Sequence, residues 1–332
     1  MKATEYETLI KASDERDTLR ILSGTVYAPY VINLPTEEFS LLAFENALLK
    51  SYYDVYERVM SYTTGIARDF LAKVYRRYEL TCLKFVLRAF LTKVPLKEIA
   101  TYITPIGSFT PQICADLLKK KEPKEIIDMV KEDNLKVKLL SALEKCAQLH
   151  SSIPAESAID QYFFTTLWKL VGQFDDWDRR TIRILGTEID MSNINILLRG
   201  KAIGLNPSTI KELLIPIRYR LGSELEYSLN TPTALDTLRA LTSGHYSDQL
   251  SSAIAACERE KTILPTELVL KRHFLKENLG VFGGYPFQIG TLLAYLNLKF
   301  YEISDVRAIV VGKWNRLTSE RIKELLVLYE LM

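Results

Sequence analysis

The sequence predicts an all-α protein built from three similar helical units that close into a ring or funnel with pseudo-threefold symmetry. Helix-forming residues dominate the 332-residue chain, whereas glycine, with 14 copies, and proline, with 12, are sparse. Apolar residues recur at spacings of three and four, as on one face of an α-helix. The third observation is a sequence pattern that recurs at a repeat interval of about 111 residues.

Composition excludes several functional classes. Forty-three basic and 41 acidic residues leave a net charge of +2, so there is no bulk electrostatic basis for binding nucleic acid or an anionic membrane. The four cysteines are far apart and form no Cys-x-x-Cys pair, and only three histidines accompany them. We therefore expect neither a metal site nor a cofactor, and interpret these cysteines as reduced core thiols: Cys82, Cys114, Cys146 and Cys257.

The first seven residues are polar and acidic, unlike a secretory signal with its basic start and apolar run. This predicts a cytoplasmic location. No stretch approaches the roughly 20 consecutive apolar residues that cross a bilayer. We expect a peripheral protein that meets the membrane only through a partner.

Three predicted helix starts look alike. Each has a proline, then threonine or alanine, then glutamate, and they occupy residues 34–37, 153–156 and 264–267. Proline interrupts the preceding element, threonine can cap free amides, and glutamate favours the positive end of the helix dipole. The last two starts are separated by one repeat interval.

The register continues inside each unit. Residues 190–214 and 302–326 share nine identities, where unrelated sequences would share roughly one or two. The first copy is fainter, although Glu79 and Arg88 stand one repeat interval before Asp190 and Arg199. Its helices are expected to be about two turns longer.

The end of each unit also repeats, except that the third unit lacks one. Residues 139–146 match 250–257 one repeat interval later, and residues 17–20 are identical to 236–239. We therefore predict that the N-terminal segment completes the third unit and closes the ring, whereas an open solenoid would need capping units. The predicted units are 34–152, 153–263, and 264–332 plus 1–33.

Three motifs in the same order carry a family resemblance: residues 78–88, residues 188–201 and residues 286–299. The chain resembles the C subunit of the V/A-type rotary ATPases, the homologue of the eukaryotic d subunit. The resemblance implies a three-domain helical funnel on the cytoplasmic face of the membrane proteolipid ring that receives the central shaft. It also implies a torque-carrying, non-catalytic role. One departure is the absence of an expected glycine in residues 214–218.

The resulting prediction is a non-catalytic subunit that couples the rotor shaft to the proteolipid ring of a proton- or sodium-translocating ATPase. A generic helical scaffold is one alternative, although such repeats have periods of about 34 to 47 residues. An all-α diphosphate-using enzyme is another, because Asp175, Asp176 and Asp178 could bind magnesium. We find no second acidic cluster and prefer a solvated turn. Residues 280–286 read as an inter-helix loop, since a phosphate-binding loop needs a following Lys-Ser/Thr.

Several polar residues remain candidates for either a buried lock between helices or a contact with shaft or ring. Asp190 and Asn193 share a helix face, where a carboxylate could bond an arginine. We prefer the lock. Lys201 and Lys313 follow a glycine that could end a helix, which favours exposed contacts that Trp314 joins. The full set is Glu79, Arg88, Asp190, Asn193, Arg199, Lys201, Glu302, Asp305, Arg307, Lys313 and Trp314.

Overall fold

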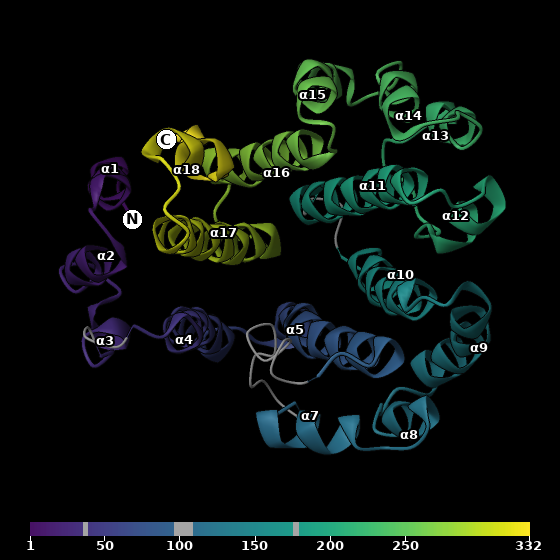
Figure 1. Ribbon diagram of the computed structural model, residues 1–332, viewed down its shortest axis with the longest axis horizontal. Helices are drawn as coiled ribbons and strands as arrows, with labels where there is room; N and C mark the ends of the chain where they lie inside the picture. Colours follow the sequence, from purple (N-terminus) through teal and green to yellow (C-terminus); the bar gives the residue numbers. More distant parts are fainter. Residues whose placement is uncertain (36–38, 96–108, 175–178) are drawn as a thin grey trace. The chain divides into compact units, whose positions relative to one another are not determined.

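The computed structural model describes residues 1–35, 39–95, 109–174 and 179–332, and these residues form helices and loops with no β-strand (Figure 1). The predicted all-α class is confirmed. The chain divides into two compact units. Unit 1 comprises Met1–Thr64, Asp178–Ile184 and Glu267–Met332, and unit 2 comprises Gly65–Trp177 and Leu185–Thr266. These two units are defined by contacts within the fold, not by sequence similarity. They therefore do not test the boundaries of the three sequence repeats, which stay a prediction.

Unit 1 combines helices from both ends of the chain. They are α1 (Ala3–Lys11), α2 (Glu15–Leu22), α3 (Ala28–Val31), α4 (Leu41–Ser61), most of α16 (Leu264–Leu279), the 3₁₀ helix η2 (Gly280–Gly283), α17 (Ile289–Trp314), α18 (Ser319–Leu325) and the 3₁₀ helix η3 (Tyr329–Leu331).

Unit 2 holds the middle of the chain. Its helices are α5 (Gly65–Thr92), α7 (Pro111–Leu118), α8 (Pro123–Ile127), α9 (Asp133–Leu149), α10 (Ile153–Val171), most of α11 (Arg179–Ala202), α12 (Pro207–Leu213), α13 (Ser223–Ser228), α14 (Ala234–Leu241) and α15 (Ser247–Glu260).

Two of the three predicted helix starts are confirmed: α10 begins at Ile153 and α16 at Leu264, each followed by its proline. The first predicted start, at residues 34–37, falls partly outside the described residues, and the next described helix begins after it. There α4 begins at Leu41, because the Ser40 hydroxyl accepts a hydrogen bond from the Ala43 amide (3.3 Å) and caps the helix. Thr36 and Glu37 lie outside the described residues.

In unit 1 the N-terminal helices pack against the C-terminal ones. Helices α1 and α2 both contact α17, and α1 also contacts α18. The rings of Tyr6 and Tyr329 lie 5.5 Å apart, and the Ser319 hydroxyl donates to the Ile10 carbonyl (3.0 Å). Helix α4 also packs along α17. The first and last helices of the chain therefore share one core.

In unit 2, α10 packs on both α9 and α5, and α14 packs on both α13 and α15. All four cysteines are buried and form no disulfide within the described residues, which agrees with their interpretation as reduced core thiols. Among the described residues of both units, every helix is too short or too polar to cross a membrane.

Several helices end on a residue with left-handed backbone geometry, and these positions follow the sequence repeat. Lys93, Gly204 and Arg316 have φ angles of 56°, 77° and 57°, and each stands one repeat interval from the next. His150 and Lys261, which end α9 and α15, have φ angles of 48° and 53° and are separated by the same interval. The same turn geometry thus recurs where the sequence pattern recurs.

Candidate functional site

Asp190, on α11 in unit 2, is fully buried and gathers three hydrogen-bond donors. Its carboxylate accepts from the backbone amides of Tyr219 (2.9 Å) and Arg220 (2.6 Å) and from the Tyr246 hydroxyl (2.9 Å). It therefore ties α11 to the segment before α13 and to the residue that precedes α15. The donors are neutral, whereas the sequence had suggested an arginine.

The electrostatics of this cluster are set by burial. Burial raises the pKa of Asp190, and the three donated hydrogen bonds only partly oppose that effect. Burial, followed by the nearby charge of Asp190, raises the pKa of Tyr246. Tyr246 therefore stays protonated at neutral pH and remains a donor. A carboxylate served by fixed donors in this way is suited to holding backbone rather than to transferring protons.

Asn193, one helical turn further along α11, is also fully buried and holds the same connecting segment. Its side-chain amide donates to the carbonyls of Ile215 (3.2 Å) and Ile217 (3.0 Å), and its oxygen accepts from the Ile215 amide (2.8 Å). The residue between them, Pro216, has no amide to satisfy. A neutral amide with both donors and an acceptor matches this arrangement.

Asp305 stands one repeat interval after Asn193, on α17 in unit 1, and meets a different backbone pattern. It accepts from the amides of Val327 (2.8 Å), Leu328 (2.9 Å) and Tyr329 (2.9 Å). Leu328 occupies the register position of Pro216 and supplies an N–H that proline cannot. Burial raises the pKa of Asp305 to about 6, although the three amides counteract part of the rise.

Glu302 stands one repeat interval after Asp190 and has side-chain partners. It accepts from the Tyr27 hydroxyl (2.5 Å) and from the Lys299 ammonium (2.6 Å). Lys299 also donates to the Tyr27 hydroxyl (3.0 Å). Burial alone would raise the pKa of Glu302, but the charge and hydrogen bond of Lys299 hold it below its usual value.

Sequence reasoning missed the two tyrosines and the lysine in these clusters. Tyr27 and Tyr246 have the same separation along the chain as the matched segments 17–20 and 236–239. Extending that match by seven positions would have found the pair. Lys299 lies within a motif that carried the family resemblance, but its role depends on Tyr27, far away in the sequence.

Glu79, one repeat interval before Asp190, belongs to an ionic cluster on α5. Arg76 forms ion pairs with Glu79 and with Glu132, and its Nε lies 3.0 Å from a Glu132 carboxylate oxygen. Burial would raise the pKa of Glu132, but Arg76 holds it below its usual value. In this cluster an arginine donates to the carboxylates, whereas backbone amides and a tyrosine donate to Asp190.

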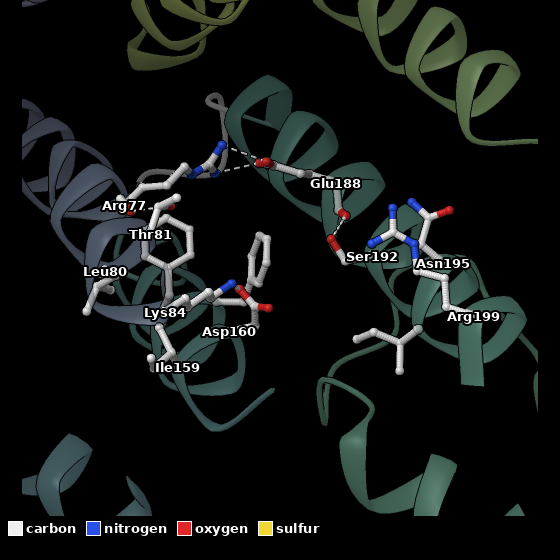
Figure 2. A pocket seen from close by; sticks show the side chains of 13 residues that line it. Arg77, Leu80, Thr81, Lys84, Ile159, Asp160, Glu188, Ser192, Asn195 and Arg199 are labelled. Carbon is white, nitrogen blue, oxygen red and sulfur yellow. Dashed lines mark hydrogen bonds and ion pairs between the residues drawn. The ribbon is translucent and has the colours of Figure 1, made fainter. Parts of the chain in front are cut away.

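A pocket of about 320 Å³ lies between α5, α10 and α11 in unit 2 (Figure 2). Two of its cations come from α5 and a third, Arg199, comes from α11, and its carboxylates come from α10 and α11. Arg77 pairs with Glu188 (2.7 Å), and Lys84 pairs with Asp160. Further along the same helices, Arg88 pairs with Glu156.

These ion pairs connect α5 to its neighbours. For Glu156, burial would raise the pKa, but Arg88 and Ser152 hold it low. Arg199, the counterpart of Arg88 in the sequence repeat, is exposed and lines the same pocket beside Asn195 (Figure 2). Asp190 and Asn193 therefore bond to the same connecting segment after α12, whereas Arg199 lies at the pocket and not in that cluster.

The interpretation of the glycines before Lys201 and Lys313 was wrong. Both glycines lie inside helices, because α11 continues to Ala202 and α17 to Trp314. A Cβ on Gly200 would lie 2.8 Å from an Ile210 side-chain carbon, and one on Gly312 would lie 2.6 Å from Ile322. Glycine there permits the close approach of α12 and α18 instead of ending a helix.

The two lysines differ from the prediction as well. Lys201 is half-buried and donates to the carbonyls of Leu229 and Thr231 (2.6 Å each). Lys313 is half-buried, and Trp314 is 47% exposed with its ring 5.3 Å from that of Phe39. Arg307 forms an ion pair with the buried Glu45. In this group Trp314 and Arg307 are exposed, and Trp314 supplies the exposed aromatic surface.

Within residues 1–35, 39–95, 109–174 and 179–332, histidine, cysteine, aspartate and glutamate do not form a group of three that could hold a metal ion. The aspartates considered for magnesium, Asp175, Asp176 and Asp178, lie outside the described residues. What the buried polar groups visibly do is join helices to each other and to the segments that follow them.

The fold and these clusters define an all-α protein whose buried polar groups fix helices in place. The family model described as the ATP synthase (C/AC39) subunit matches residues 1–325, and the chain belongs to that family. This confirms the resemblance found in the sequence.

Archaeal relatives are named as the C subunit of A-type ATP synthase. That of Methanocaldococcus jannaschii is 24% identical over 323 residues, which cover 96% of this chain and 80% of the relative. That of Pyrococcus horikoshii is 25% identical over 309 residues, covering 92% and 80%. The relative from Halobacterium salinarum is 22% identical over 332 residues, covering 98% and 92%.

Proposed function

We propose that this chain is a non-catalytic central-stalk subunit that couples the rotor shaft to the membrane proteolipid ring of a V/A-type ATPase or ATP synthase. It would lie on the cytoplasmic face of the membrane, and the driving ion would be a proton or sodium. The observation that carries the proposal is the family match over residues 1–325. A subunit of this kind must be stiff, and the buried polar clusters supply that property.

The proposal includes three repeated units, 34–152, 153–263, and 264–332 completed by 1–33. Equivalent hydrogen bonds support it: Tyr246 donates to Asp190, and Tyr27 donates to Glu302, the counterpart of Asp190 in the repeat. The second of these bonds joins the N-terminal segment to the C-terminal part of the chain.

A second pair of equivalent bonds supports the same register. Gln161 donates to the carbonyls of Glu212 and Leu214 at the end of α12. Arg272, one repeat interval later, donates to the carbonyls of Glu324 and Leu326 at the end of α18. Because the bonded residues differ in type, the repeated arrangement reflects backbone geometry more than sequence identity.

Closure of the ring is supported by two ion pairs. Lys84 on α5 pairs with Asp160 on α10, and Arg307 on α17 pairs with Glu45 on α4. Arg307 stands at the register position of Lys84, two repeat intervals on. In the proposed scheme the first pair joins the repeat 34–152 to the repeat 153–263. The second pair joins the repeat 264–332 plus 1–33 back to the repeat 34–152. A closed set of units transmits torque without hinging.

The proposed shaft contact centres on Trp314. Its exposed ring packs against Phe39, and Leu317, 38% exposed, follows it beyond the end of α17. Exposed aromatics anchored on a rigid helix often dominate binding energy at protein interfaces. Lys313 and Arg316 lie beside Trp314 in the sequence and would favour an acidic shaft surface.

A pull-down with purified shaft subunits and, separately, with detergent-solubilised proteolipid ring tests the proposal. We expect the wild-type chain to capture both. Trp314→Ala should weaken shaft binding by about tenfold or more, as for a typical hot spot, and leave ring binding unchanged. Ile32→Ala, at a residue that is 65% exposed in the same unit, is the matched control. Failure of the wild-type chain to bind either partner would overturn the coupling function.

A further inference from the structure

An exposed histidine lies beside the buried Asp190 cluster in unit 2. His245 directly precedes Tyr246, and its Nε2 atom lies 2.8 Å from a guanidinium nitrogen of Arg220. The Arg220 backbone amide (2.6 Å) and the Tyr246 hydroxyl (2.9 Å) both donate to the same oxygen, Oδ2 of Asp190. The contact between His245 and Arg220, the His245 clasp, therefore links at the surface the two chain segments whose donors meet at that buried oxygen.

The His245 clasp requires a neutral imidazole. A guanidinium has only donors and stays charged, so Nε2 of His245 must accept this hydrogen bond and carry no proton. The single proton of the neutral ring is then on Nδ1. If the ring gained a second proton, Nε2 would become a donor that faces the Arg220 donors, so the bond would be lost and two cations would lie side by side.

A second partner for a charged ring lies close by. The Glu224 carboxylate lies against Gly244, the residue before His245, and occupies the space that a Cβ on that glycine would need. In the structure this carboxylate accepts a hydrogen bond from the Gly222 amide (2.9 Å) at the start of α13. A protonated imidazole can therefore exchange the arginine for a carboxylate through side-chain rotations alone.

The titratable and charged groups nearest to His245, in space or along the chain, come from α11, the segment before α13, α13 itself and the start of α15. They are Asp190, Arg220, Glu224, Tyr246 and Asp248. Arg220 opposes a positive charge on the ring, whereas the carboxylates favour one. A neutral ring thus holds Arg220, and a charged ring is held by Glu224.

The corresponding cluster in unit 1 has a valine where this cluster has the histidine. Tyr27, the counterpart of Tyr246 in the sequence repeat, follows Val26. Its bond to Glu302 is accompanied by Lys299 instead. A bond between a tyrosine and a buried carboxylate therefore does not require a titratable clasp, and the consequences of protonating His245 should be confined to unit 2.

We propose that the His245 clasp is a pH-sensitive switch, which closes beside the Asp190 cluster when the imidazole is neutral and opens when the ring is protonated. Opening releases the Arg220 side chain and loosens the backbone segment whose amides bond to Asp190. Histidine side chains usually take up their second proton between about pH 5 and pH 8, so the switch would respond to mild acidification. It depends only on contacts inside unit 2 and is independent of the proposed coupling function.

Hydrogen–deuterium exchange of the full chain at about pH 5.5 and about pH 7.5 tests this inference. The reading is taken on peptides that contain Tyr219 and Arg220, after correction for the intrinsic pH dependence of exchange. We expect the protection of these amides to fall about two- to fivefold at the lower pH, the effect that the loss of one exposed pair allows.

His245→Gln is the main comparison, because glutamine keeps an acceptor for Arg220 but does not titrate. The fall in protection should be smaller in this variant than in the wild type. Protonation of Asp190 contributes to both chains, so the difference between them isolates the histidine. His245→Lys, which is charged at both pH values, should show low protection at both. His150→Gln removes another exposed imidazole of unit 2 and should respond like the wild type.

Trp168 provides an independent optical reading, since its ring lies 6.3 Å from that of Tyr219. In a chain whose other two tryptophans, Trp177 and Trp314, are replaced by phenylalanine, its emission should change over the same pH range, and the change should be smaller when His245→Gln is added.

Four results would overturn the inference. They are an absence of any fall in protection in the wild-type chain, equal falls in the wild type and His245→Gln, high protection of His245→Lys at both pH values, and loss of the response in His150→Gln. Shaft and ring capture at pH 7.5 keeps the two proposals separate, because His245→Gln should bind both partners as the wild type does whether or not the switch exists.

Discussion

The two buried polar clusters on α11 and α17 occupy equivalent sequence positions, but different positions within each cluster bond to the backbone amides. On α11 the first position, Asp190, holds backbone amides, and the second, Asn193, pairs with backbone carbonyls. On α17 the first position, Glu302, accepts from the Tyr27 and Lys299 side chains and from the Met1 ammonium, and the second, Asp305, holds three backbone amides. The backbone-holding carboxylate has moved by one helical turn.

The chemistry of the following segment explains the exchange. Pro216 offers no N–H, so a carboxylate facing it would lack a donor, and an amide side chain fits instead. Leu328 offers an N–H at the same register position, and Asp305 accepts it. The comparison shows that a repeat can preserve which elements are joined while the bonding groups change.

The largest expected difference between the clusters concerns the first position. Asp190→Ala would remove the acceptor of the Tyr219 and Arg220 backbone amides and the carboxylate partner of Tyr246, at a cost of about 3 to 5 kcal/mol in the free energy of unfolding. Glu302→Ala should cost less, about 1 to 2 kcal/mol, because the Lys299 side chain can turn toward solvent. Urea unfolding followed by circular dichroism at 222 nm measures both.

Asp190→Asn is the matched control for this prediction. This variant keeps one acceptor oxygen and the side-chain volume. Its free energy of unfolding should therefore lie between the values for the wild type and for Asp190→Ala. Equal losses for Asp190→Ala and Glu302→Ala would contradict the idea that fixed backbone donors make the α11 cluster the more demanding one.

The second difference is the sign of the pH dependence. The pKa of Asp305 is about 6 in the folded chain, against a usual 3.8, so the folded state holds this proton more tightly than the unfolded state. Its contribution to the free energy of unfolding should therefore fall as pH rises from about 4 to about 6, by up to about 3 kcal/mol. Above that range it should be constant.

Glu302 should behave in the opposite sense, because its pKa is lowered on folding. Its stabilising contribution should be present above its ordinary pKa and be lost as pH falls through the folded value. Subtracting the pH–stability profiles of Asp305→Asn and Glu302→Gln from that of the wild type isolates each contribution. Difference profiles with the same sign of slope would show that burial and Lys299 do not set these pKa values as described.

The sequence was sufficient for the all-α class and the family, because these depend on local periodicity and on motif order. The correspondence of Asp190 with Glu302 and of Asn193 with Asp305 in the sequence repeat stays a prediction. The sequence could not identify the donors. Tyr246 is 56 residues from Asp190, and Tyr27 is 275 residues from Glu302, so those contacts exist only in the folded chain. The glycines were mispredicted for a physical reason: the same residue permits a helix end and the close approach of another helix, as Gly200 does for Ile210.

The third prediction concerns the exchange at the second position. Asn193→Asp would place carboxylate oxygens beside the carbonyls of Ile215 and Ile217, which cannot donate, at a cost of about 2 to 3 kcal/mol at neutral pH. The loss should shrink at acidic pH, because a protonated carboxyl can donate to a carbonyl. Chemical unfolding at pH 4.5 and pH 7.5 provides the comparison.

A double-mutant cycle on α17 sharpens the same point. Leu328→Pro removes one amide that Asp305 accepts, so it should cost more in the wild type than in the Asp305→Asn background, with a coupling energy of about 1 kcal/mol. Additive effects would show that Leu328 and Asp305 are not matched in the way that Pro216 and Asn193 are.

The smallest expected effect separates the two tyrosines. Tyr246→Phe removes a donor from Asp190, which has no positively charged side chain among its described partners, at a cost of about 1 to 2 kcal/mol. Tyr27→Phe should cost about 1 kcal/mol or less, because Lys299 continues to neutralise Glu302. Thermal unfolding of the two variants should therefore rank Tyr246→Phe as the less stable.

Tyr27→Phe should have a separate effect on proteolysis. The Tyr27–Glu302 bond joins the N-terminal helices to α17, and its loss should speed proteolytic cleavage between α1 and α3 more than Tyr246→Phe does. Cleavage at equal rates would mean that this bond does not hold the N-terminal segment in place.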